Sequence, residues 1–75
     1  MEQILIVEDD PVLGRGLVLA LDGAERACTL ASDCAGARRA LAASSFALAI
    51  FDINLPDGSG LTLLEETRAA GGPPV

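Results

Sequence analysis

The sequence of 75 residues lacks histidine, lysine, tryptophan and tyrosine, and these absences exclude several kinds of chemistry. Without an imidazole, histidine acid–base catalysis and histidine-ligated zinc are excluded. Without a lysine amine, a Schiff base and the phosphate-binding lysine of a P-loop are excluded. Acidic residues number 11 against 5 basic ones, all arginine, and the net charge is −6. A surface for nucleic acid or anionic lipid is therefore not expected.

Long apolar runs and cysteine are also scarce. No run approaches the roughly 20 apolar residues of a membrane span. The start MEQILIVEDD has no basic residue of the kind that opens a signal peptide. We therefore predict a cytoplasmic chain without a membrane segment. Cys28 and Cys34 are too few for a disulfide scaffold, and we interpret them as small buried or half-buried residues in a reducing compartment.

The sequence is rich in aliphatic residues, because hydrophobic residues make up 51% of it and aromatic residues only 3%. Its length allows one small domain. Apolar runs predict strands over 4–7, 26–31 and 46–51, and three-to-four-residue periodicity with capping signals predicts helices over 11–22, 33–43 and 60–70. This alternation predicts an α/β fold with a parallel sheet and right-handed crossovers.

Side chains that cap helices are expected at three places. Asp10 precedes a first-turn proline, Ser32 or Asp33 precedes the second helix, and Ser59 precedes the third. Asp57 lies in a turn-rich loop and is interpreted as a turn residue. The residues expected to face the sheet are Leu13, Leu17, Ala20 and Leu21 of the first helix, Ala37, Ala40 and Leu41 of the second, and Leu61 and Leu64 of the third.

Carboxylates follow two of the three predicted strands. Glu8 and Asp9 come after the first strand, and Asp52 comes after the third. If these strands are neighbours, the three acids meet at one rim of the sheet, where ligands of open parallel sheets bind. Carboxylates about 4 Å apart repel one another, so such a cluster either retains protons or holds a cation. Ligands that are all oxygen favour Mg²⁺.

These motifs, taken in order, carry a resemblance to a known family. ILIVEDD followed by proline, an apolar third strand ending in Asp52, and then INLPDGSGL resemble the receiver domain of bacterial two-component response regulators, in register from residue 3 to about 75. The resemblance implies a flavodoxin-like, doubly wound parallel sheet. Residues 1–75 correspond to its first three βα units, with strand order 2-1-3 and part of one receiver domain.

The resemblance also implies roles for individual residues. Asp52 matches the phosphoacceptor, which takes a phosphoryl group from a sensor histidine kinase. Asp9 matches the acid that binds Mg²⁺ directly, and Glu8 matches its partner, which acts through metal-bound water. Asn54 matches the residue whose backbone carbonyl completes the metal site. The implied activity is self-phosphorylation from a phosphohistidine donor, which is not the activity of a classical enzyme.

Two residues of the family pattern have no counterpart here. The switch Ser/Thr follows the family's fourth strand and the characteristic Lys follows the fifth, beyond Val75. We expect a fragment of a longer regulator, often one with a transcriptional output domain, in which this segment makes no direct contact with nucleic acid. A naturally short product, or a homodimer or domain swap that completes the fold, are the alternatives. Without a fourth strand beside it, the third strand is expected to have an open edge.

Two other functions remain open at this point. A truncated receiver that is no longer phosphorylated would act as a protein-interaction or dimerisation module, and the absence of Lys favours it. A toprim-like Mg²⁺-dependent phosphoryl enzyme would use Glu8 and Asp52, although the second acid of that pattern is replaced by Asn54.

Overall fold

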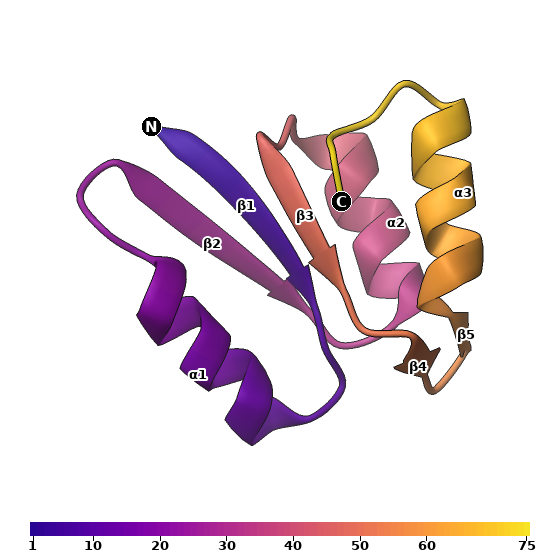
Figure 1. Cartoon of the computed structure of the whole chain (residues 1–75), viewed down its shortest axis with the longest axis horizontal. Helices are drawn as coiled ribbons and strands as arrows, with labels where there is room; N and C mark the ends of the chain where they lie inside the picture. The colour runs from indigo at the N-terminus through magenta and orange to yellow at the C-terminus, as the bar shows by residue number, and fades with distance from the viewer.

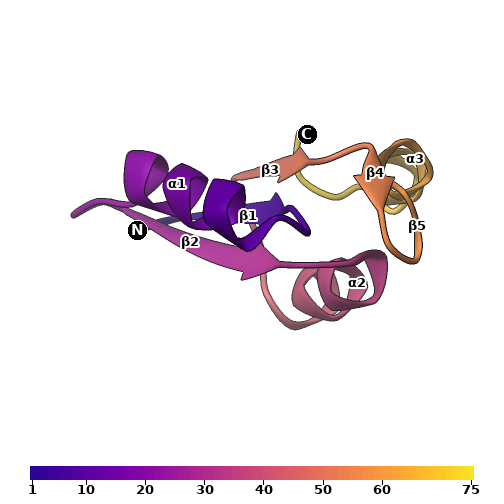
Figure 2. The same cartoon turned by 90° about the horizontal axis from the view of Figure 1, so that it is seen from below.

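The computed structural model describes all 75 residues, Met1–Val75. Its elements in chain order are β1 (Glu2–Val7), α1 (Pro11–Leu21), β2 (Arg26–Ala31), α2 (Cys34–Ala43), β3 (Leu48–Phe51), β4 (Asn54–Leu55), β5 (Gly58–Ser59) and α3 (Gly60–Ala69). The first three strands form a parallel sheet in the order β2-β1-β3, as predicted. Helix α1 covers one face of this sheet, whereas α2 covers the other with α3 beside it on the β3 side (Figures 1 and 2).

The central strand β1 explains why its sequence shows no polar alternation. Ile4 to Val7 pair with β2 on one side and with β3 on the other, and all four are buried. A strand covered on both faces selects apolar residues at every position. Strand β3 is shorter than the predicted 46–51, because its register pairs with β1 run only from Leu48 opposite Ile4 to Phe51 opposite Val7. Just before it, the Ala47 N–H still donates to the Gln3 carbonyl at 2.7 Å.

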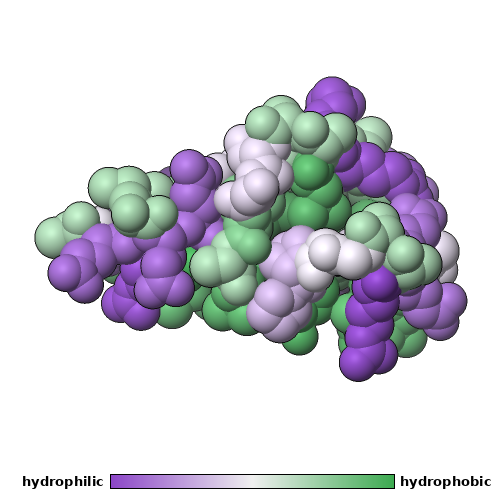
Figure 3. All heavy atoms as spheres, turned by 90° about the horizontal axis from the view of Figure 1, so that it is seen from above, coloured by the Kyte–Doolittle hydropathy of each residue, from purple (hydrophilic) through white to green (hydrophobic).

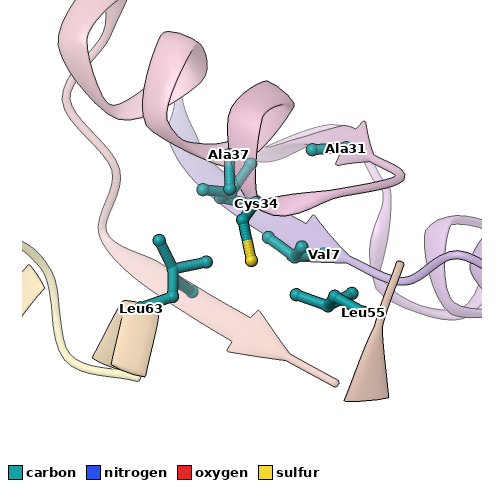
Figure 4. Close-up of a cluster of buried hydrophobic side chains, with 8 residues drawn as sticks. Val7, Ala31, Cys34, Ala37, Leu55 and Leu63 are labelled. Atoms are coloured by element: carbon teal, nitrogen blue, oxygen red, sulfur yellow. The ribbon is translucent and has the colours of Figure 1, made fainter. Parts of the chain in front are cut away.

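The core lies between the sheet and the α2–α3 layer. Its buried members are Leu5, Val7, Ala31, Cys34, Ala37, Ala49, Leu55 and Leu63. Figure 4 shows the sulfur of Cys34 pointing into the space bounded by Val7, Leu55 and Leu63. The absence of a large side chain at Ala37 lets α2 approach the sheet closely, as expected for its small-residue face. Both cysteines are free, with Cys34 buried and Cys28 half-buried, as predicted.

The three predicted helix starts are confirmed. The Asp10 carboxylate accepts hydrogen bonds from the N–H groups of Val12 and Leu13 at 2.9 and 3.3 Å. Asp33, rather than Ser32, caps α2. The Ser59 hydroxyl accepts from the first turn of α3 at 3.1 Å. Each cap satisfies backbone donors that have no partner within the helix.

The prediction for the buried face of α1 was partly wrong. Gly14 is buried, and Leu17 and Val18 are half-buried, but Leu13 is 52% exposed and Ala20 is also exposed. A Cβ atom at Gly14 would lie 3.0 Å from the Leu30 side chain of β2. The helix therefore approaches the sheet through Gly14, and this contact sets its rotation so that Leu13 turns outward.

The prediction for α3 was also wrong at Leu61, which is 53% exposed. The buried residues of this helix are Gly60, Leu63 and Thr67. They are spaced three and four apart, as a helical stripe requires. The Thr67 hydroxyl donates to the Leu63 carbonyl at 2.7 Å, which satisfies the one polar group on this stripe.

The outer edge of β3 is not entirely open. The Ala49 N–H donates to the Pro74 carbonyl at 2.8 Å, and Figure 1 shows the C-terminal residues lying beside β3. The expectation of an open edge on β3 is therefore corrected at this position. None of the helices has both the length and the apolar character needed to cross a bilayer.

Candidate functional site

The three predicted acids converge where β1 and β3 end. Val7 and Phe51 are register partners, so the residues that follow them leave the sheet side by side. The pairing extends one step further, because the Asp52 N–H donates to the Val7 carbonyl at 2.9 Å and the Glu8 N–H to the Ala31 carbonyl at 2.9 Å. Backbone hydrogen bonds therefore fix the positions from which the carboxylates project.

One carboxylate oxygen from each of Glu8, Asp9 and Asp52 lies within 4.8 Å of the others. Glu8 is buried, Asp52 is half-buried and Asp9 is exposed. Burial raises the pKa of Glu8 above its ordinary value, and the neighbouring carboxylate of Asp52 raises it further. The N–H of Asp10 donates to Glu8 Oε2 at 3.4 Å and lowers the same pKa. Negative charge is crowded here, and a cation would relieve it.

The donor set suits a small hard cation. In octahedral Mg²⁺ with oxygens at about 2.1 Å, neighbouring ligand oxygens lie about 3 Å apart and opposite ones about 4 Å apart. Carboxylate oxygens within 4.8 Å of one another require only small rotations, or a bridging water, to match this spacing. No cysteine or histidine competes, so a softer metal is not favoured. The exposed Asp9 side leaves room for water ligands.

Asn54, the fourth predicted ligand, lies in β4, opposite Ser59 of β5. It is exposed, and its amide side chain adds no carboxylate to the cluster. It follows Asp52 closely along the chain, with only Ile53 between them. Its backbone carbonyl is therefore the group to consider, as the resemblance implies.

The loop from Asp52 to Gly60 folds back on its own start. The Gly60 N–H donates to the Ile53 carbonyl at 2.8 Å, and β4 pairs with β5 to form a short hairpin within the region predicted as a turn-rich loop. A Cβ atom at Gly60 would overlap the Asp52 carbonyl oxygen. A residue with any side chain cannot come this close, which gives a packing reason for the glycine at this position.

Asp57 has a larger role than the turn residue that sequence reasoning predicted. Its carboxylate accepts hydrogen bonds from the N–H groups of Cys34 and Ala35, at 2.7 and 3.0 Å. These are the first two residues of α2. Both hydrogen bonds hold the pKa of Asp57 below its ordinary value. No local signal reveals this contact, because its partners are more than twenty residues away along the chain.

A separate cleft of ≈ 490 Å³ lies at the other end of the molecule. It is lined by Arg38, Leu41, Ser44, Ser45, Phe46, Leu63, Glu66, Thr67, Ala70, Gly71, Gly72 and Pro73. Figure 3 shows hydrophobic side chains in the hollow of the face seen from above. The guanidinium of Arg38 on α2 pairs with the Glu66 carboxylate on α3 through two contacts of 3.0 Å. None of the clustered acids lines this cleft.

Comparison with known sequences gives a consistent result. The sequence model of the response regulator receiver domain matches residues 4–75. The transcriptional regulatory protein PmrA of Pectobacterium parmentieri is 41% identical over 66 residues, which is 88% of this chain and 30% of that protein. The swarming motility regulation protein RssB of Serratia marcescens is 43% identical over 68 residues, 91% of this chain and 31% of that protein. This chain thus spans about 30% of the length of these relatives.

Solved structures agree with the sequences. The non-phosphorylated HemR receiver domain from Leptospira biflexa superposes with a TM-score of 0.83 at 32% identity, covering 92% of this chain and 56% of that one. The MaeR response regulator bound to beryllium trifluoride gives a TM-score of 0.82 at 31% identity, covering 99% of this chain and 62% of that one. Strand order, the matched residues and these likenesses agree on the flavodoxin-like fold. This chain belongs to the response regulator receiver domain family.

Proposed function

We propose that this chain is a phosphoacceptor module, in which Asp52 takes a phosphoryl group from a sensor histidine kinase in the presence of Mg²⁺. Glu8, Asp9, Asp52 and the backbone carbonyl of Asn54 would hold the cation. The observation that carries the proposal is the cluster of three carboxylate oxygens within 4.8 Å, at the ends of two adjacent strands. Residues 1–75 would supply the first three βα units of the receiver domain.

The reaction assigns different roles to the three acids. An oxygen of Asp52 attacks phosphorus, the new O–P bond forms, and the P–N bond of phosphohistidine breaks with its electron pair going to the imidazole nitrogen, which takes up a proton. Glu8 is buried and cannot approach a donor in line, whereas Asp52 is half-buried at the rim. Bound Mg²⁺ would offset negative charge on the phosphoryl oxygens as they approach the carboxylates.

The proposal is tested with a small phosphoryl donor. The chain is incubated with acetyl phosphate and Mg²⁺, and its intact mass is measured. We expect the mass of one added phosphoryl group, its loss in Asp52→Asn, and its retention in the control Asp22→Asn, because Asp22 lies near β2 and accepts a hydrogen bond from Cys28. Chelation of Mg²⁺ should also abolish the gain. Equal labelling of the native chain and Asp52→Asn would contradict the proposal.

The wider setting follows from the relatives. PmrA and the 39%-identical BasR of Escherichia coli (strain K12) are transcriptional regulatory proteins. We propose that this receiver likewise controls a transcriptional output in the cytoplasm, with a sensor histidine kinase as its partner and without touching nucleic acid itself.

A second candidate is an interaction module that pairs with another protein without being phosphorylated. It is favoured by large apolar side chains that remain exposed, among them Leu13, Leu19 and Leu48. A homodimer in solution, measured by light scattering, together with no phosphoryl gain, would favour this candidate over the first.

A further inference from the structure

The loop between β3 and α3 carries both Asp52 and Asn54, so its position affects the carboxylate cluster directly. Several contacts hold this loop, and three of them involve Leu55, Gly60 and Asp57. Leu55 lies in the core, Gly60 lies against the Asp52 carbonyl, and the Asp57 carboxylate accepts two N–H groups of α2. The first two contacts are local or apolar. The third is the only one of these in which a charged group of the loop bonds to a different element.

The Asp57 contact is strong for its type. A carboxylate that accepts two backbone N–H groups at a helix N-terminus gains charge-assisted hydrogen bonds and favourable alignment with the helix dipole. The amides belong to Cys34 and Ala35, whereas Asp33 caps the same helix by accepting from Gly36 at 2.7 Å. Asp33 thus stabilises α2 from within its own chain segment. Of these two aspartates, Asp57 is the one that joins α2 to the loop.

Next to the Asp57 carboxylate, the hairpin also packs closely against α2. A Cβ atom at Gly58 would lie 3.2 Å from the sulfur of Cys34, so the turn of the hairpin rests directly on the first residue of α2. The hairpin has only two residue pairs, Asn54 with Ser59 and Leu55 with Gly58. Such a short ladder adds little rigidity of its own, so the contacts of the hairpin with α2 contribute to its orientation.

We propose that Asp57 is a positioning residue for the cation site: by binding the first amides of α2, it fixes the hairpin that carries the Asn54 carbonyl and follows the Asp52 carboxylate. This inference rests on the proposed function. Groups that orient metal ligands without touching the metal typically change metal affinity by tenfold or more. Without the hydrogen bonds of Asp57, the loop has to become ordered when the cation binds. The free energy that this ordering costs lowers the affinity for the cation.

The experiment measures Mg²⁺ affinity by isothermal titration calorimetry on the full 75-residue chain, and stability by urea unfolding followed by circular dichroism. Asp57→Asn keeps the size of the side chain but removes its charge and one acceptor oxygen. The control is Asp33→Ala, which removes the cap from the same helix end without touching the loop. We expect both variants to lose stability, and only Asp57→Asn to bind Mg²⁺ about tenfold more weakly.

Each outcome bears on a separate statement. Native affinity in Asp57→Asn, or an equal loss of affinity in both variants, overturns the positioning role and leaves the proposed function standing. A native chain that does not bind Mg²⁺ overturns the proposed function, and the positioning role with it. If Asp57→Asn does not fold, Asp57→Glu decides, because it keeps the charge but displaces the loop by one methylene. Its affinity should fall by several-fold, and native affinity would overturn the role.

Discussion

At the scale of single residues, the site depends on a glycine, which has no side chain, as well as on its carboxylates. Gly60 lies just past the hairpin, against the Asp52 carbonyl, where no Cβ atom fits. The approach closes the loop on itself and brings the first turn of α3 to the carboxyl end of β3. A backbone contact of this kind cannot be relieved by rotating a side chain, so the main chain itself must move.

Gly60→Ala should therefore destabilise the chain by roughly 3 kcal/mol or more, because the new methyl group displaces the backbone of Asp52. Urea unfolding measures the loss. Gly16→Ala is the control, since it is exposed within α1 and no neighbouring group lies within 4 Å of the methyl group that the change adds. That change should raise stability by about 0.5–1 kcal/mol. Similar effects in both variants would refute the packing described for Gly60.

At the scale of elements, α2 receives its N-terminal caps from two places in the chain. The Asp33 carboxylate accepts a hydrogen bond from the Gly36 N–H, and the Asp57 carboxylate accepts from the N–H groups of Cys34 and Ala35. The helix has no acidic residue in its own first turn, so these two aspartates provide the negative charge that complements its dipole.

This arrangement predicts a pH dependence of stability. The folded-state pKa of Asp57 lies below its unfolded value, so its contribution is present above the unfolded pKa and is lost as pH falls through the folded pKa. Glu66, whose pKa is lowered by Arg38, acts in the same direction, whereas the raised pKa of Glu8 acts in the opposite one. Urea unfolding from about pH 6 down to about pH 3 should show a smaller acid-dependent loss in Asp57→Asn than in the native chain. An identical slope in the two proteins would argue against the contribution of Asp57.

The elements also show how far sequence reasoning extends. The order of strands and helices, the caps at Asp10, Asp33 and Ser59, and the convergence of the three acids were predicted, because each depends on local pattern or on the adjacency of parallel strands. The buried face of α3 was predicted only in part, because Leu64 is half-buried whereas Leu61 is exposed. Its rotation is set by the contact of Gly60 with the backbone at Asp52, which no periodicity in the helix reveals. The contact of Asp57 with α2 escaped for the same reason, since it joins distant segments.

At the scale of the whole molecule, the core cluster occupies one face of the sheet. The core cluster lies on the side of α2 and α3, where Leu63 is 1% exposed. A chain of this length buries a modest fraction of its surface, so each large core side chain carries a sizeable share of the total stability.

Leu63→Ala should accordingly cost about 2–5 kcal/mol, because it removes a buried side chain and leaves a cavity between α3 and the sheet. A loss of this size approaches the stability of a small domain, and the variant should unfold at much lower urea concentration. Leu61→Ala, at an exposed position of the same helix, should stay within about 0.5 kcal/mol of the native chain. The reverse ranking would mean that α3 presents its other side to the sheet.

The carboxylates start from backbone that the sheet itself holds, since the N–H groups of Glu8 and Asp52 continue the ladder beyond β1 and β3. Architecture and reactivity are consequently separable at this rim. The change Asp52→Asn replaces a carboxylate with an amide, which is a poorer nucleophile toward a phosphoryl donor, while β1 and β3 stay in place. Such a frame tolerates changes in its reactive groups. Under the proposed function, a chain whose residue 52 no longer accepts a phosphoryl group would keep the surface that its partners bind.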